Sequence, residues 1–220
     1  MIDNRLQTQN NPLTIINLFS DSCSAQNKNT FVMTALLYFI NHKAKVINEI
    51  HHYIPIRGHS YMPPDQVFGR IEKKLRQMET ILSPYEYYNV FKEYTTVKTF
   101  GKDYDIMDFK SAVKKIVKKV DFKSTEQKHY SYIRGKKTVG VSPSYEEEPI
   151  RVNVLKKQAN LENLGSAEKL PKSNHVKQPK QEDVRHLLQF LIIPNDVQDF
   201  YDDIFNDNNG SISPIEDCQV

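Results

Sequence analysis

The sequence predicts an α/β fold: a mixed β-sheet with flanking helices. Over residues 14 to 78, two short runs rich in apolar and β-branched residues alternate with two helical patterns. After about residue 127 the apolar period changes from that of a helix to that of strands. The 220 residues include 39% hydrophobic residues, which is enough for one modest core with polar tails.

The first predicted strand covers residues 13 to 19. Its nearly continuous apolar character is typical of a strand that is buried on both faces of a sheet. The run ends in a polar cluster, so Asp21 would lie at the carboxyl end of the strand, where open α/β sheets bind ligands. We predict that a helix begins near Thr30, with Asn27 or Asn29 as its N-cap.

The second predicted strand covers residues 46 to 54 and also ends in a polar loop, at residues 57 to 65. We expect Asp65 to cap the helix that follows, because the apolar residues beyond it recur on one helical stripe. Glu72 follows Asp65 by roughly two helical turns, so both carboxylates can lie on one side of that helix.

These elements predict a cation site. Parallel strands joined by a helix place both polar loops at the same end of the sheet, so the carboxylates of Asp21 and Asp65 are expected to meet there. Carboxylate oxygens suit Mg²⁺ or Mn²⁺, and two such ions can clamp the attacking and leaving oxygens of a phosphodiester. The alternative is that Asp65 is only a helix cap and Asp21 only a turn residue.

Other polar side chains are expected at the same end of the sheet. Gln26, Asn27 and Lys28 are candidates to contact phosphate. His59, in the loop Gly-His-Ser, could orient a phosphate or act as an acid or base, because histidine titrates near neutral pH. An ordinary loop histidine that hydrogen-bonds to the backbone is an equally good interpretation.

Zinc and thiol chemistry have little support. His51 and His52 are adjacent on a predicted strand, so their side chains point to opposite faces. Cys23 and Cys218 are too far apart for a paired metal motif. Sparse cysteines, the lack of a signal region and the lack of an apolar run of about 20 residues predict an intracellular protein, nuclear or cytoplasmic, without a membrane span.

The two polar clusters resemble a known family. The first reads Ser-Asp-Ser-Cys-Ser-Ala-Gln-Asn-Lys-Asn from Ser20, and the second reads Gly-His-Ser-Tyr-Met-Pro-Pro-Asp-x-x-Phe-Gly-x-Ile-Glu-Lys from Gly58. They resemble the C-terminal half of transposon-derived animal proteins, abundant in insects, with a domain of unknown function. That domain is similar to the ribonuclease-H-like core of DDE/D transposases, and the resemblance covers roughly residues 13 to 206.

The resemblance implies a partial ribonuclease-H-like core whose parent chemistry is metal-dependent cleavage or strand transfer of DNA. Asp21 would match the acid after the fourth core strand, and Asp65, or else Glu72, the acid on the next helix. Only twelve residues precede the first predicted strand, so we expect the first acid of such a core to be missing. The resemblance therefore implies a truncated Mg²⁺-dependent nuclease or transposase-like enzyme, with an incomplete site that need not be active.

A helix is next predicted over residues 85 to 95, with Ser83 as its cap and Pro84 at its first position. The clearest amphipathic helix follows over residues 108 to 120. Its apolar side chains recur at helical spacing at Phe109, Val113, Ile116, Val117 and Val120.

The segment 108–123 is a candidate nucleic-acid-binding surface. Between Lys98 and Lys137 the sequence has twelve Lys or Arg and five Asp or Glu, an excess of seven positive charges. We expect the phosphate contacts from Lys114, Lys115, Lys118 and Lys119. This gives a second hypothesis, a non-catalytic remnant that binds nucleic acid or protein, and its alternative is an ordinary solvated helix face.

The rest of the chain predicts short strands near 128–133, 136–141 and 150–155, with Arg134-Gly135 as a turn, and then two helices. The predicted segments are a disordered lead-in (1–12), the partial ribonuclease-H-like α/β core (13–126), a small antiparallel β appendage (127–156), a linker (157–180), a helical hairpin (181–206) and a disordered acidic tail (207–220).

Overall fold

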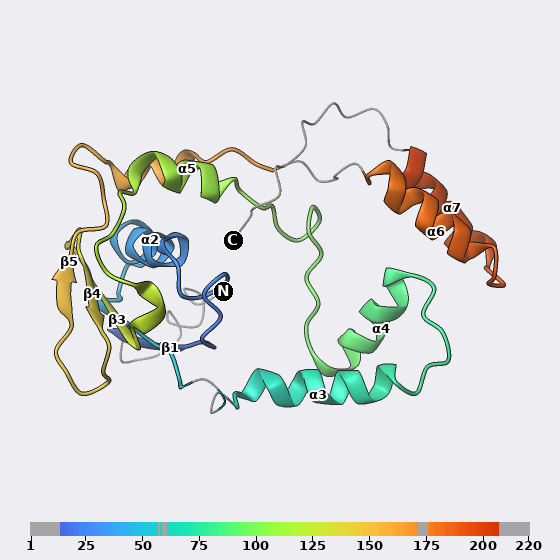
Figure 1. The fold of residues 1–220 in the computed structure, drawn as a ribbon, viewed down its shortest axis with the longest axis horizontal. Coiled ribbons are helices and arrows are strands. Elements are labelled where there is room, and N and C mark those ends of the chain that lie inside the picture. Colours follow the sequence, from blue (N-terminus) through green and yellow to red (C-terminus); the bar gives the residue numbers. More distant parts are fainter. Residues whose placement is uncertain (1–13, 57, 59–60, 171–175, 207–220) are drawn as a thin grey trace. The chain divides into compact units, whose positions relative to one another are not determined.

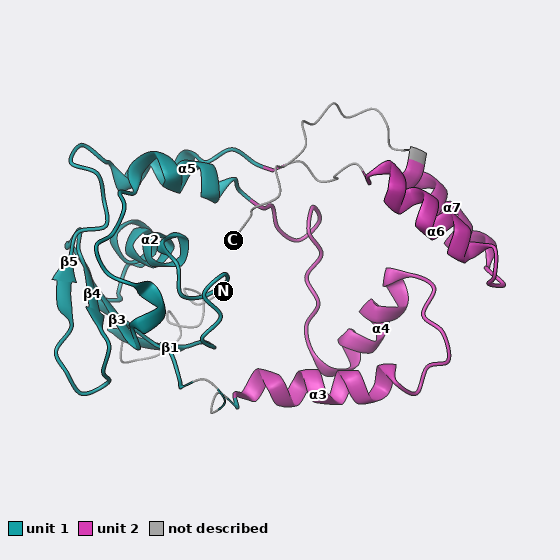
Figure 2. Ribbon diagram, viewed as in Figure 1, with its two compact units in different colours: residues 1–61, 107–169 teal, residues 62–106, 170–220 magenta. Residues whose placement is uncertain are grey.

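The computed structural model describes residues 14–56, 58, 61–170 and 176–206 (Figure 1). The predicted disordered lead-in and acidic tail lie outside the described residues. The chain divides into two compact units (Figure 2). Unit 1 comprises residues 1–61 and 107–169, and unit 2 comprises residues 62–106 and 170–220. This division differs from the predicted segments. Residues 62–106 were predicted as part of the α/β core (13–126), but they belong to unit 2.

Unit 1 is built on a five-stranded mixed sheet in the order β1-β2-β3-β4-β5. Strand β1 pairs with β2 in parallel, and every later pair is antiparallel. The predicted α/β class, with a mixed sheet and flanking helices, is confirmed. The strands are β1 (Ile15–Phe19), β2 (Glu49–Tyr53), β3 (His129–Ile133), β4 (Val139–Ser142) and β5 (Ile150–Val152).

The last three strands are not a separate appendage, which corrects that part of the prediction. Strand β3 pairs with β2 along its whole length, with Ile50 opposite Tyr132 and His52 opposite Tyr130. Both tyrosines are buried in the same core as Ile50. Three short strands alone could not bury these rings, so joining the existing sheet is the favourable arrangement.

Helix α2 (Thr30–Tyr38) makes the crossover from β1 to β2, and a π-helical turn, η1 (Phe39–Lys43), extends it. The helix begins where it was predicted to begin. Asn29 is the N-cap, and its side chain accepts a hydrogen bond of 3.0 Å from the backbone N–H of Val32. That bond satisfies one of the donors left free at a helix start.

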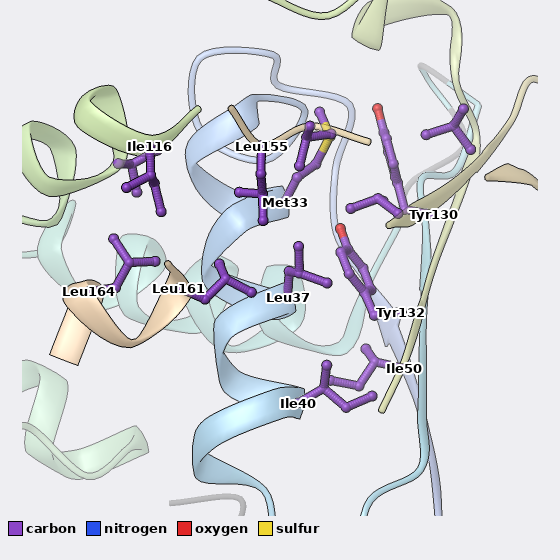
Figure 3. Close-up of a cluster of buried hydrophobic side chains, with 14 of the residues drawn as sticks. Met33, Leu37, Ile40, Ile50, Ile116, Tyr130, Tyr132, Leu155, Leu161 and Leu164 are labelled. Carbon is purple, nitrogen blue, oxygen red and sulfur yellow. The ribbon is translucent and has the colours of Figure 1, made fainter. Parts of the chain in front are cut away.

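The core of unit 1 lies between the sheet and the helices on one of its faces. Figure 3 shows Leu37 and Ile40, from α2 and η1, beside Tyr132 and Ile50 of the sheet. All four are almost completely buried. Each such side chain contributes roughly 1.5–3 kcal/mol by leaving water, so these contacts fix the helix layer on the sheet.

Helix α5 (Phe109–Ile116) is shorter than predicted. The amphipathic pattern continues to Val120, but Val117 is extended and forms an isolated bridge with Leu155. The backbone N–H of Lys118 also donates to the carbonyl of Val154. Pairing with a distant segment therefore replaces the last turn of the predicted helix.

The polar stretch expected as a linker is partly structured. It contains a 3₁₀ segment, η3 (Leu161–Ser166), in which Leu161 and Leu164 are buried in the core of unit 1. Two leucines three positions apart were too weak a pattern to identify this element from the sequence. A further short 3₁₀ turn, η2 (Ser124–Glu126), precedes β3.

The described residues of unit 2 form helices and one isolated bridge, between Phe100 and Tyr104. The helices are α3 (Pro63–Leu75), α4 (Pro84–Tyr94), α6 (Gln178–Leu188) and α7 (Asn195–Asn206), which confirms the predicted helices near 85–95 and 181–206. Phe68 and Phe91 join α3 to α4 by an edge contact. The hydroxyl of Tyr201 on α7 donates to the carbonyl of Leu82 at 2.9 Å.

Candidate functional site

The candidate site of unit 1 lies at the carboxyl ends of the parallel strands β1 and β2. Open α/β sheets bind ligands at this position, because the loops that leave the strands spread apart there. In this protein the loops are residues 20–29 and 54–56, and they border two hollows. The sequence placed Asp21 here correctly, as the second residue after β1.

The side chain of Asp21 is hydrogen-bonded within the loop to which it belongs, residues 20–29. One of its carboxylate oxygens, Oδ1, accepts a 2.6 Å hydrogen bond from the side-chain amide of Asn27 and a 3.1 Å bond from the backbone N–H of Cys23. This arrangement holds residues 20–29 in a fixed turn before α2. Asn27, predicted to contact phosphate, is thus a partner of Asp21.

Lys28 is only 6% exposed, which is unusual for a lysine. Its Nζ donates to the backbone carbonyl of Thr125 at 2.6 Å and so ties the loop to the segment before β3. Gln26, the third predicted phosphate contact, is exposed. The structure therefore gives Lys28 an internal contact and leaves Gln26 at the surface.

The ends of β1 and β2 are joined by a serine–histidine pair that the sequence did not reveal. Ser20 Oγ lies 2.7 Å from His52 Nε2. Burial lowers the pKa of His52 to about 4, so the ring is neutral at pH 7 and can accept the serine proton in a hydrogen bond. His51 and His52 alternate between the two faces of β2, as predicted, with His52 on the buried side.

The face of the sheet opposite the helices carries a row of aromatic rings. Phe19 stacks on Tyr53 with ring centroids 5.4 Å apart, and Tyr53 stacks on His129 at 4.5 Å. His51 stacks on His129 at 5.2 Å, and their ring nitrogens lie 3.0 Å apart. Register explains the row, because Phe19, Tyr53 and His129 are directly opposite one another on β1, β2 and β3.

Two hollows lie at the strand ends, and the first of them borders this row. The first has a volume of about 450 Å³ and is lined by Phe19, Tyr53, Pro55, Ile56 and Tyr145. The second, of about 420 Å³, shares the wall formed by Pro55 and Ile56. Its remaining lining is mostly polar, comprising Ser22, Ser24, Lys28, Ile54, Thr125, Glu126 and Lys128.

The other predicted acidic ligands lie in unit 2. Asp65 is the third residue of α3, and its Oδ2 accepts a 2.7 Å hydrogen bond from the backbone N–H of Met62, the N-cap. It thus closes a capping box, although it is not the cap itself. Glu72 forms an exposed ion pair with Arg76, at 2.6 Å. His59 lies outside the described residues.

These donors do not form a divalent-cation site within either unit, as far as the structure describes the chain. The described residues contain no group of three or more His, Cys, Asp or Glu side chains that could hold a metal ion. Asp21 and Asp65 belong to different units, and each is already hydrogen-bonded within its own unit. The described residues of either unit alone therefore do not supply a donor set that fits Mg²⁺ or Mn²⁺, and a metal site that uses Asp21 and Asp65 stays a prediction.

The lysine-rich segment 108–123 forms a second candidate surface. Val113 and Ile116 of α5 are buried, whereas Lys114, Lys115, Lys118 and Lys119 are all exposed, which leaves one apolar and one basic side. Lys156 adds positive charge, because its Nζ donates to the carbonyl oxygens of Lys114 and Lys115 at the end of the helix.

The positive charge of this segment also affects the pKa of Asp108, the N-cap of α5. Hydrogen bonds from Ser111, one of them a 3.0 Å bond from its backbone N–H, hold the pKa of Asp108 below its ordinary value, and the charges of Lys115 and Lys110 lower it further. The carboxylate of Asp108 is thus ionised at neutral pH and offsets only a small part of the basic surface.

Comparison with known proteins places the chain in a family. Residues 3–147 match the model of a family described as Domain of unknown function (DUF7869). The match covers more than half of the chain, so the protein belongs to this family. No curated protein and no solved structure matched it. Among the described residues, no helix combines the length and the apolar character needed to cross a membrane.

Proposed function

We propose that this member of the DUF7869 family binds nucleic acid through its phosphate backbone, with segment 108–123 as the contact surface. The observation that carries the proposal is the two-sided character of this segment. Its apolar side chains pack in the core of unit 1, so the four lysines lie on the solvent side of α5 and of the residues that follow it. Lysines arranged in this way contact phosphates without reading base sequence.

The salt dependence of binding tests the proposal. Each lysine that contacts a phosphate adds about 1 to the negative slope of log affinity against log salt concentration. Replacing Lys114, Lys115, Lys118 and Lys119 with alanine should therefore flatten the slope by up to about 4. Fluorescence anisotropy of a labelled duplex over a range of salt concentrations measures it.

A matched control separates this surface from general positive charge. Lys43, Lys45, Lys136 and Lys137 are four other exposed lysines of unit 1. Their replacement by glutamate changes the net charge as much as the same replacement in segment 108–123. We expect only the latter variant to lose most of its affinity, and equal losses in both variants would refute a defined surface.

A second candidate function, the metal-dependent phosphodiester chemistry of a transposase-derived core, is favoured by the position of Asp21. This carboxylate follows β1 at the carboxyl end of a parallel pair, and the sequence resemblance to transposon-derived proteins points to the same position. In this proposal Asp21 would be one ligand of Mg²⁺ or Mn²⁺, and Asp65 or Glu72 keeps its place as a sequence-predicted ligand. The ion would stabilise the charge that develops on the phosphate.

Calorimetric titration with Mn²⁺ tests this candidate. The Asp21→Asn and Asp65→Asn double variant should lose the binding heat of the parent protein, because an amide does not supply the charge that the cation requires. Asp103→Asn is the control, since Asp103 also accepts a backbone hydrogen bond, from Thr99, in a turn remote in sequence from both. Equal heats for the parent and the double variant would end the metal proposal.

A further inference from the structure

The row of stacked rings ends at an exposed ring. Phe19 is 63% exposed, and among the described residues its only stacked partner is Tyr53. The row therefore runs from the interior of the sheet, at His129, outward to a phenylalanine on the edge strand β1. Hydrophobic burial does not account for a phenylalanine at position 19, because more than half of the side-chain surface remains in water.

The first hollow is formed around the end of this row. Tyr145, from the loop between β4 and β5, contributes to its lining, and the Tyr145 hydroxyl donates to the carbonyl of Ile54 at 2.8 Å. Pro55 and Ile56 also line this open hollow. The lining is almost entirely apolar, and a volume of about 450 Å³ is within the range of small-ligand pockets.

Positive charge lies next to this apolar hollow. The Nζ of Lys128 is 5.6 Å from the centre of the Tyr145 ring and also lines the second hollow, beyond Pro55 and Ile56. Lys28 also lines the second hollow. The carboxylate among its lining residues, Glu126, forms an ion pair with Lys123 at 3.0 Å. The second hollow thus has net positive charge and offers serine hydroxyls from Ser22 and Ser24.

We propose that the first hollow binds one unpaired base of a single-stranded nucleic acid, with the adjoining phosphate in the second hollow. A base is flat and largely apolar on its faces, so it can extend a row of parallel rings, and proteins bind single strands in this way. Charge complementarity selects this occupant over an apolar peptide side chain, which would gain nothing from Lys128.

This inference shares one premise with the proposed function, namely that the ligand is a nucleic acid. The residues that carry it belong to the strand ends and the loop after β4, whereas the proposed backbone contacts belong to segment 108–123. It adds a preference that the lysines alone do not give, because a base within a duplex cannot enter the hollow. The two proposals can therefore fail separately.

The test uses a short thymidine oligonucleotide with one 2-aminopurine, whose fluorescence is quenched when it stacks on an aromatic ring. The amplitude of quenching at saturating protein reports stacking, and the titration midpoint reports affinity. In Phe19→Leu the side chain stays apolar and the ring is lost, so we expect the quenching to disappear and the affinity to fall on the order of tenfold.

Phe190→Leu is the matched control, because it removes another exposed phenylalanine ring, in unit 2, at 73% exposure. It should leave the quenching unchanged. Quenching that is equal in the parent and in Phe19→Leu would overturn the base site, as would strand binding without any quenching. If the lysine variants of segment 108–123 keep full affinity while quenching persists, the backbone proposal fails and the base site stands.

Discussion

The two faces of the sheet in unit 1 are made by the same strands but have opposite chemistry. On one face, Ile50, Tyr130 and Tyr132 are sealed beneath α2 and α5. On the other, Phe19, Tyr53 and His51 stack on their neighbours and stay partly in water. The alternation of side chains along a strand separates the two sets. The comparison shows that one set of strands can bury one side in a core and leave a row of aromatic rings partly open to water on the other.

The largest effect that tests this comparison is on the free energy of unfolding. Leu37→Ala removes a fully buried side chain from the helix-covered face and should cost about 3 kcal/mol, because it leaves a cavity. Ile15→Ala, at a half-exposed position on the opposite face, should cost under about 1 kcal/mol. Urea unfolding measures both, and similar losses would mean that the open face is as tightly packed as the core.

A smaller effect should appear on acidification. The pKa of His52 falls from 6.5 to about 4 on folding, so above pH 6.5 the ring is neutral in both states. Below that value the unfolded chain binds a proton that the folded chain does not, and stability is lost as the pH falls from 6.5 to about 4. Allowing for solvent screening, we expect a loss of roughly 2 kcal/mol.

Urea midpoints at several pH values measure this loss. His52→Gln should flatten the curve, because glutamine does not titrate. A residual slope is expected from His129, whose pKa is also lowered, chiefly by burial and further by His51. An unchanged curve in His52→Gln would show that the titration of His52 does not govern acid stability.

The smallest expected effect is a difference in the free energy of unfolding between variants of two buried tyrosines on the helix-covered face. The hydroxyl of Tyr130 donates to the carbonyl of Ser124 at 2.9 Å, whereas that of Tyr132 has no hydrogen-bond partner among the described residues. Tyr130→Phe should therefore cost about 1 kcal/mol, and Tyr132→Phe should be neutral or stabilising. Thermal unfolding of the two variants checks the order, and a greater loss in Tyr132→Phe would contradict it.

Local signals in the sequence predicted much of the fold. Asn29, as one of two candidates, and Ser83 were predicted as helix caps because short polar side chains are favoured directly before a helical pattern. The predicted turn after β3 is present, and Gly135 adopts a φ of +76° there, which glycine tolerates without strain. Both strands of the parallel pair were also found, although β2 is shorter than predicted.

Local signals failed where a distant segment competes. The prediction that β1 is buried on both faces was wrong, since Ile15 is half exposed and Phe19 is 63% exposed. An apolar run has the same appearance whether its second face meets a core or solvent, so the sequence could not separate the two. The row of rings was missed for the same reason, because its members are far apart along the chain.

The sequence by itself determined the order of the main strands and helices, the helix start at Ser83 and the concentration of positive charge in the middle of the chain. Those features depend on neighbouring residues and on composition. Only the tertiary structure decided that β3 joins β2, that α5 ends at Ile116 and that Phe19, Tyr53 and His129 form one row. Each of these depends on strand register or on pairing between remote segments, which the free energy of the whole fold selects.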